Sequence, residues 1–293
     1  MELLFIFTSL VLFLSFILLL RKQSKIFNKK LPPGPWKLPF IGNLHQLMNG
    51  RLPHYTFRDL SRKYGPIFHL RLGEVSHVVV SSPDTVKEIM KIQDLHFSTR
   101  PQLLFGEIIM YSHSDIGTCP YGDYWRNMRK VCILELLSTK IFSYMQDMFI
   151  AGAETSSAII IWALAEMIRD PRTMAKAQFE VRQVLKGKTI FEDTDLEELK
   201  YLKLVIKEML RLHPPFPLLL PRECREETRI GGYTIPVKTR VLINAWAIGR
   251  DPEYWHNPES FIPERFDNNH IDFRGNHFPL VQEEECVQGS YSA

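Results

Sequence analysis

The chain has 293 residues, of which 45% are hydrophobic and 24% are charged, and its formal net charge at pH 7 is +3. This balance is typical of a globular protein with a substantial core, and it excludes a disordered chain. So small a net charge, without a clustered basic and aromatic face, also argues against a nucleic-acid partner.

The first segment of the chain is strongly apolar. In Leu3–Leu20 the only polar residues are Thr8, Ser9 and Ser15, so the segment is long enough to cross most of a bilayer as a helix. Lysines and an arginine follow the apolar run, which predicts a single-pass anchor at 1–20 with the rest of the chain on the cytoplasmic side. A cleaved signal peptide is the alternative, although it would carry positive charge before the run.

A basic, proline-rich hinge is predicted at 21–35. It ends in Leu31-Pro32-Pro33-Gly34-Pro35, where proline restricts the backbone and Gly34 permits one sharp turn. Such a stretch forms a stiff elbow between an anchor and a globule, or a plain linker.

Strand-like and helical patterns together predict a mainly α fold with a small β region. Apolar and β-branched runs predict a hairpin at Ile67–Leu72 and His77–Val80, and a second hairpin with a further strand at Ile230–Pro236 and Arg240–Asn244. Helical periodicity and proline stops predict helices at Pro83–Met90, Tyr124–Leu137, Met145–Trp162, Pro171–Leu185 and Asp195–Leu212.

Met145–Trp162 is apolar on all sides, which predicts a helix buried in the middle of a domain. Glu154 and Thr155 interrupt it, and burying a carboxylate is costly unless something uses it. An acid beside an alcohol in an apolar wall suits proton delivery to a bound oxidant. The alternative is a helix crossing made close by small residues, with Glu154 at its rim.

A second candidate site lies in the preceding helix. Trp125 and Arg129 are one turn apart, and an indole N–H beside a guanidinium suits a carboxylate or a cofactor propionate. A tryptophan packed on an arginine stem is the alternative. The four cysteines are scattered without the spacing of a zinc site or a disulfide framework; they are Cys119, Cys132, Cys224 and Cys286.

Glu208 and Arg211 lie at i, i+3 on one helix face, a pattern that is weak alone. Arg265 follows in an apolar, proline-containing segment unsuited to a solvated helix. Two arginines around one carboxylate form a desolvated triad that can pin loops together.

Taken in order, the chain has an apolar anchor, a Pro-Pro-Gly-Pro hinge and the motifs WRNMR, AGAETS, EMLR and PERF. This series resembles a membrane-bound cytochrome P-450 of the plant microsomal type, over nearly all of Met1–Phe278. The resemblance implies a haem-thiolate monooxygenase of the endoplasmic reticulum membrane, which takes electrons from a flavoprotein reductase and oxidises a small lipophilic substrate. It also implies residue roles: proton delivery by Glu154 and Thr155, propionate binding by Trp125, Arg129 and Arg222, and a structural triad of Glu208, Arg211 and Arg265.

The chain departs from the family pattern in two ways, and these departures define the domain boundaries that we expect. Family members are much longer, and the block of helices that covers their substrate pocket is missing between Ser138 and Ser143. The haem-cysteine loop is also absent, because the chain after Phe278 reads PLVQEEECVQGSYSA. Cys286 follows three glutamates, which raise the pKa of a thiol, so no metal ligand is predicted and haem is not expected to bind.

The sequence of the tail is compatible with a shift of reading frame within the family's normal haem-cysteine loop. One choice of synonymous codons for Pro279–Ala293, with a single nucleotide restored, translates as PFGAGRRMCPGIIFS. We therefore predict an incomplete cytochrome P-450 domain at 36–278 and an aberrant, frameshifted tail at 279–293. Three hypotheses follow: a monooxygenase by family, a non-catalytic membrane-anchored remnant or faulty gene model, and an unrelated membrane-tethered binding protein.

Overall fold

The computed structural model describes residues 30–108, 110, 112–131, 145–186, 188 and 193–267, together with Thr8, Leu10, Val11 and Ser15. Between Met145 and Glu154 it describes the backbone alone. Most of the predicted anchor, the basic part of the hinge and the tail at 279–293 lie outside these residues. Within the described part of the chain, no helix combines the length and apolarity needed to cross a membrane.

The strands form a mixed sheet and a separate hairpin. β1 (Ile67–Leu72) and β2 (Val75–Val80) make the first predicted hairpin, with Ile67 opposite Val80. The sheet order is β1-β2-β6-β3, in which β6 (Arg240–Ile243) is parallel to β2 and antiparallel to β3 (Arg222–Glu223). The hairpin consists of β4 (Thr228–Ile230) and β5 (Tyr233–Ile235).

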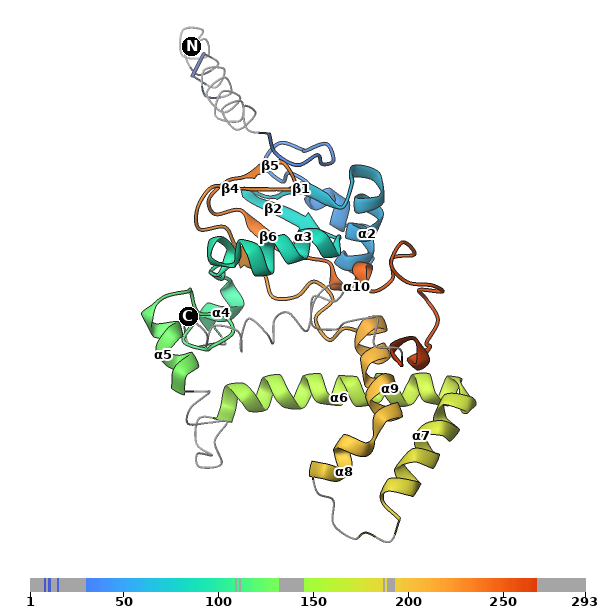
Figure 1. The fold of residues 1–293 in the computed structure, drawn as a ribbon. Helices are drawn as coiled ribbons and strands as arrows, with labels where there is room; N and C mark the ends of the chain where they lie inside the picture. Colours follow the sequence, from blue (N-terminus) through green and yellow to red (C-terminus); the bar gives the residue numbers. More distant parts are fainter. Residues whose placement is uncertain are drawn as a thin grey trace.

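Helices make up most of the remaining described structure, as the sequence predicts. Those near the sheet are η1 (Leu44–Leu47), α2 (Pro53–Tyr64), α3 (Pro83–Lys87), the π-helical turn η2 (Glu88–Ile92), η3 (Asp94–Phe97), α4 (Leu104–Ile108) and α10 (Ala245–Ile248). The others are α5 (Asp123–Val131), α6 (Met145–Arg169), α7 (Pro171–Val184), α8 (Asp193–Glu198), α9 (Lys200–Leu212) and η5 (Pro263–Phe266). Figure 1 shows the strands with α2 and α3 on one side of the molecule and α6 to α9 on the other.

The predicted helix Asp195–Leu212 is two helices, which corrects the sequence prediction. The helical backbone breaks at Leu199, whose φ of −75° and ψ of 69° are not helical. Glu180 on α7 supplies the reason, because its carboxylate accepts from the backbone N–H groups of Tyr201 (2.7 Å) and Leu202 (2.9 Å) at the start of α9. A long-range cap of this kind leaves no local sequence signal.

The proline-rich elbow packs along the sheet edge. The backbone N–H of His69 on β1 donates to the carbonyl oxygen of Pro33 (2.7 Å). Asn43, which is fully buried, donates to the carbonyl oxygen of Trp36 (2.7 Å) and accepts from the N–H of Arg71 (2.8 Å). These bonds attach residues 33–36 to β1, so this part of the elbow is a component of the folded domain.

The side chain of His69 strengthens the same junction. Its Nδ1 lies 3.1 Å from Nζ of Lys37, and its Nε2 lies 2.7 Å from Oγ of Ser76. Burial, followed by the charge of Lys37, lowers the pKa of His69 to about 3. The ring is therefore neutral at pH 7 and accepts a hydrogen bond from the Lys37 ammonium.

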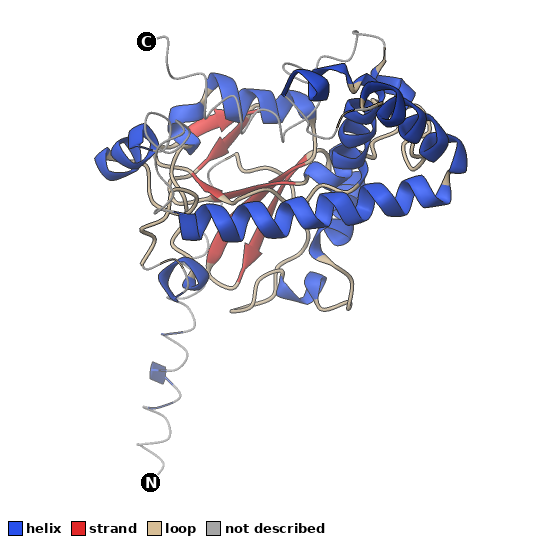
Figure 2. Cartoon of the chain, turned by 90° about the horizontal axis from the view of Figure 1, so that it is seen from below, coloured by secondary structure: helices blue, strands red, loops and turns tan. Residues whose placement is uncertain are grey.

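Helix α6 is exposed on one side, which makes the prediction of an all-round buried helix wrong for its second half. Ala163, Glu166 and Met167 are buried where α6 meets α7 and α9. Large apolar side chains on the other side are open to solvent; they are Ile160 (58% exposed), Ile161 (65%), Leu164 (46%) and Ile168 (69%). Figure 2 shows α6 crossing in front of the strands in the view from below.

We expect Gly34→Ala to destabilise the domain by about 1–3 kcal/mol, the usual cost of overpacking. A Cβ at this position would overlap the carbonyl oxygen of His69, which the β1–β2 pairing holds in place. Urea denaturation measures the change. Gly122→Ala is the matched control because a Cβ there meets no atom within 4 Å, and equal effects of the two substitutions would contradict the prediction.

We also expect the protein to self-associate through the exposed apolar residues of α6, because a contiguous apolar surface of this kind promotes association. Ile161→Lys combined with Ile168→Lys should reduce light scattering by the full chain in mild detergent as its concentration rises. The control is Val237→Lys, which changes an exposed valine on the sheet side (49% exposed, against 65% for Ile161 and 69% for Ile168). Scattering that both changes reduce equally would rule out a specific role for α6.

Candidate functional site

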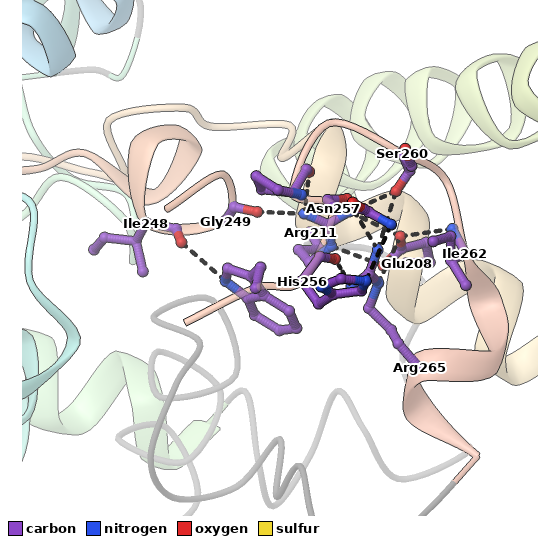
Figure 3. Close-up of polar contacts among 11 residues, drawn as sticks. Glu208, Arg211, Ile248, Gly249, His256, Asn257, Ser260, Ile262 and Arg265 are labelled. Carbon is purple, nitrogen blue, oxygen red and sulfur yellow. Dashed lines mark hydrogen bonds and ion pairs between the residues drawn. The ribbon is translucent and has the colours of Figure 1, made fainter. Parts of the chain in front are cut away.

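The most strongly organised polar site is centred on Glu208 of α9. This carboxylate is fully buried and accepts from Nε (2.7 Å) and Nη2 (2.8 Å) of Arg211, whose side chain is also fully buried. It also accepts from Nε of Arg265 (3.0 Å) and from the backbone N–H of Ile262 (2.8 Å). Figure 3 shows the two guanidinium groups converging on the carboxylate.

The remaining N–H groups of both arginines donate to backbone carbonyl oxygens. Arg211 donates to Gly249, Pro258 (2.7 Å) and Ser260 (3.0 Å). Arg265 donates to His256 (2.8 Å), Asn257 (3.3 Å) and Ser260 (3.2 Å). The structure therefore brings the three predicted triad residues together, and they hold the segment from Gly249 to Ser260 against α9.

Trp255 closes this site from the side. Its ring centroid lies 5.1 Å from Cζ of Arg211 and 6.0 Å from Cζ of Arg265, within the range of cation–π attraction. Its Nε1 donates to the carbonyl oxygen of Ile248 (3.0 Å). The ion pair lies in a desolvated environment, since the Arg265 side chain is 9% exposed and that of Glu208 is fully buried, and this burial lowers the pKa of Arg265 although Glu208 opposes the change.

Trp125 and Arg129 lie together on α5. The guanidinium of Arg129 is 5.0 Å from the Trp125 ring centroid, and the Arg129 side chain is buried. The indole Nε1 of Trp125 donates to the carbonyl oxygen of Ile116 (3.2 Å). In this structure the pair has the geometry of the packing alternative, with the indole N–H already bonded to backbone.

Arg222, the third predicted propionate ligand, is buried on β3. Its Nη1 lies 3.4 Å from the carbonyl oxygen of Phe97 and 3.6 Å from Oδ1 of Asp94. Its Nε is buried without a hydrogen-bond partner within the described residues. A buried guanidinium nitrogen that lacks an acceptor is suited to an anionic group such as a carboxylate.

Two residues that the sequence did not indicate join β3 to α5. Thr99 pairs with Glu223, and its Oγ1 accepts from the backbone N–H of Tyr121 (3.3 Å). The ring of Tyr121 lies 5.4 Å from that of Trp125. The only local signal is the four-residue spacing of Tyr121 and Trp125, whereas the contact with Thr99 is long-range.

The two residues predicted to deliver protons lie on α6. The α-helix continues without interruption through both positions. The side chain of Glu154 is outside the described structure, whereas that of Thr155 is half-buried. The structure thus places Thr155 at the boundary between the packed and open sides of α6.

The described residues do not complete a haem site. Burial raises the pKa of the thiols of Cys119 and Cys224 to about 11, which disfavours a thiolate at either position. Sγ of Cys224 also donates to the carbonyl oxygen of Glu226 (2.9 Å). Cys132 and Cys286 lie outside the described structure, and the rest shows no cluster of three or more His, Cys, Asp or Glu side chains able to hold a metal ion. Arg222 fits the carboxylate end of haem, but no described residue fits as its axial ligand.

Comparison with known families identifies the class of protein. The cytochrome P450 family model matches residues 32–147 and 140–281. The chain belongs to the cytochrome P450 family, whose activity is haem-dependent oxygenation of lipophilic substrates.

Two of the relatives in this family are enzymes of plants. The chain is 39% identical to premnaspirodiene oxygenase of Hyoscyamus muticus, covering 94% of this chain and 85% of the relative. It is 36% identical to 5-epiaristolochene 1,3-dihydroxylase of Nicotiana tabacum with the same coverage. A solved structure of a zebra fish cytochrome P450 with progesterone shares the fold, with a TM-score of 0.67, 20% identity, and coverage of 74% of this chain and 84% of that chain.

The matches also locate the missing block. The alignment with premnaspirodiene oxygenase spans 429 positions, more than the 293 residues of the chain, so the relative carries residues within the matched region that this chain lacks. The two family segments overlap at residues 140–147, a stretch that includes most of the predicted gap at Ser138–Ser143. The prediction of a truncated plant cytochrome P450 is confirmed, and the second family segment ends at residue 281, before Cys286.

We expect Glu208→Gln to destabilise the protein by about 3–5 kcal/mol, because it removes the one charge that two buried guanidinium groups share. Urea denaturation measures the loss. Lys176→Gln is the control, since it breaks an exposed ion pair with Glu264 and should leave the unfolding midpoint unchanged. A Glu208→Gln protein as stable as the control would show that the triad does not hold the fold together.

Proposed function

We propose that this protein is, by lineage, a membrane-anchored haem-dependent monooxygenase that oxidises a small lipophilic substrate of plant secondary metabolism. The observation that carries the proposal is the match to plant oxygenases over 94% of the chain. Two relatives of the chain are named for oxygenation of premnaspirodiene and dihydroxylation of 5-epiaristolochene. The buried Glu208 triad supports it, because the residues of the EMLR and PERF motifs form one site.

The proposal assigns roles to the candidate site residues. Arg222, whose buried Nε has no hydrogen-bond partner in the described part of the chain, would bind a haem propionate, and Trp125 and Arg129 would do so after the indole exchanges its bond to Ile116. Glu154 and Thr155 would deliver protons from α6. A haem iron with a thiolate ligand supplies oxygen activation in this family, and that ligand is what the described residues lack.

A second candidate function is a non-catalytic, membrane-anchored remnant. The specific observation in its favour is the tail, where Cys286 follows Glu283, Glu284 and Glu285 and has no glycine just before it. A thiolate beside three carboxylates is electrostatically disfavoured. On this reading the chain as written keeps the scaffold and lacks oxygen activation.

Both candidate functions include a membrane anchor. We propose that residues 1–20 form the anchor, that 21–35 form a hinge, and that the globular part lies on the cytoplasmic side of the endoplasmic reticulum membrane. The support is the apolar run Leu3–Leu20 followed by Arg21, Lys22, Lys25, Lys29 and Lys30. A flavoprotein reductase would be the electron-donating partner, as the family resemblance implies.

The carbon-monoxide difference spectrum of the reduced protein separates the two candidate functions. We expect no band of a thiolate-bound haem from the chain as written. The same chain with its last fifteen residues replaced by PFGAGRRMCPGIIFS should gain the band, and its own control replaces the cysteine of that tail with alanine. A thiolate band from the chain as written would contradict the remnant, whereas its absence from the restored protein would show that the lost helices are also needed for haem binding.

A further inference from the structure

Among the described side chains, helix α6 meets the end of α9 at a polar contact that lies beside apolar residues. Trp162 and Glu166 lie one turn apart on α6, and His213 follows the last residue of α9. Nε2 of His213 is 2.8 Å from Oε1 of Glu166. The His213 ring also stacks on the Trp162 indole, with centroids 4.1 Å apart and planes inclined by 9°.

Burial makes this contact energetically significant. Glu166 is only 8% exposed, and a carboxylate is costly to bury without a donor. Burial lowers the pKa of His213, Arg250 and Arg169 lower it further, and Glu166 opposes them. The ring is therefore neutral at pH 7, with Nε2–H donating to the carboxylate. Arg169, whose side chain is 77% exposed, approaches the same oxygen to 3.5 Å from the solvent side.

The apolar contact that α6 makes with α9 through Met167 constrains the rotation of α6 only weakly. Met167 packs against Val205 of α9, and methionine adapts to different packing arrangements. His213, by contrast, is held in place, since its backbone N–H donates to the carbonyl oxygen of Met209 (2.7 Å) and Pro214 restricts its backbone. A directional hydrogen bond and a ring stack on this fixed side chain allow only one rotation of α6 about its axis.

The same contact bears on Thr155. Helix geometry places Thr155, Trp162 and Glu166 on one face to within about 20°, with Thr155 about 10 Å along the axis from Trp162. Ser157 lies two residues further on and therefore points to the opposite side. A rotation of α6 would turn one of these two side chains towards the packed side and the other away from it.

We propose that Trp162, Glu166 and His213 form a rotational lock, and that they are positioning residues which set the direction in which Thr155 faces. The functional part of this inference rests on the proposed role of Thr155 in proton delivery. The lock itself depends on neither haem nor turnover, because every contact that forms it is made within the protein.

Thiol labelling of two reporters in the full chain tests the lock. Thr155→Cys and Ser157→Cys are labelled separately, and mass spectrometry reads the modified peptide so that native cysteines do not interfere. We expect Glu166→Ala or His213→Ala to raise labelling at position 155 about tenfold and to lower it at position 157. Glu166→Gln still accepts from Nε2 and should keep both rates within about twofold, and Lys176→Gln, which breaks an exposed ion pair on α7, is the surface control.

Opposite changes at the two reporters would establish rotation. Rates that rise together would show general loosening of α6, and unchanged rates would show that the contact holds nothing; either result overturns the lock. Because labelling requires no cofactor, failure of the lock is distinguishable from failure of the monooxygenase proposal, which the carbon-monoxide spectrum tests.

Discussion

The fold depends above all on one buried carboxylate. Glu208 has no exposed surface, and two guanidinium groups and a backbone N–H donate to it. One carboxylate and two guanidinium groups leave an excess positive charge in a desolvated environment. The carbonyl oxygens of the segment between Gly249 and Ser260 stabilise this charge, because each carries a partial negative charge directed at an arginine N–H. The segment is therefore held by these electrostatic contacts together with a small apolar cluster, in which Trp255 packs with Phe266, Leu204 and Leu210.

This arrangement connects the two sides of the molecule. Helix α9 carries Glu208 and Arg211 and packs on α6 and α7 through Val205, while Gly249, which accepts from Arg211, directly follows α10 beside the sheet. One path from α6 to the strands thus passes through this ion-pair site. All of its contacts are made within the protein, so the site holds the segment from Gly249 to Ser260 on α9 without a cofactor.

The sequence predicted what is local or carried by a motif. The β1–β2 hairpin, the start of α7 at Pro171 and the grouping of Glu208 with Arg211 follow from short local patterns, and Arg265 followed from its apolar, proline-fixed setting. The sequence did not predict the break at Leu199, because its cause is Glu180 on another helix. It also left open whether Trp125 and Arg129 pack on each other or face a ligand, since one spacing serves both arrangements.

The sequence wrongly predicted that α6 is buried on all sides, and the cause is the length of chain available to cover it. An all-round apolar helix indicates burial only when enough chain exists to surround it, and the plant relatives carry residues at this point in the alignment that the present chain lacks. The packed side of α6 keeps its partners on α7 and α9, whereas Ile160, Ile161, Leu164 and Ile168 have lost the burial that their apolar character implies. The apolar pattern of α6 therefore matches the buried environment that a longer protein would provide. Where Glu166 and His213 hold the helix by a directional contact, its orientation does not require that covering.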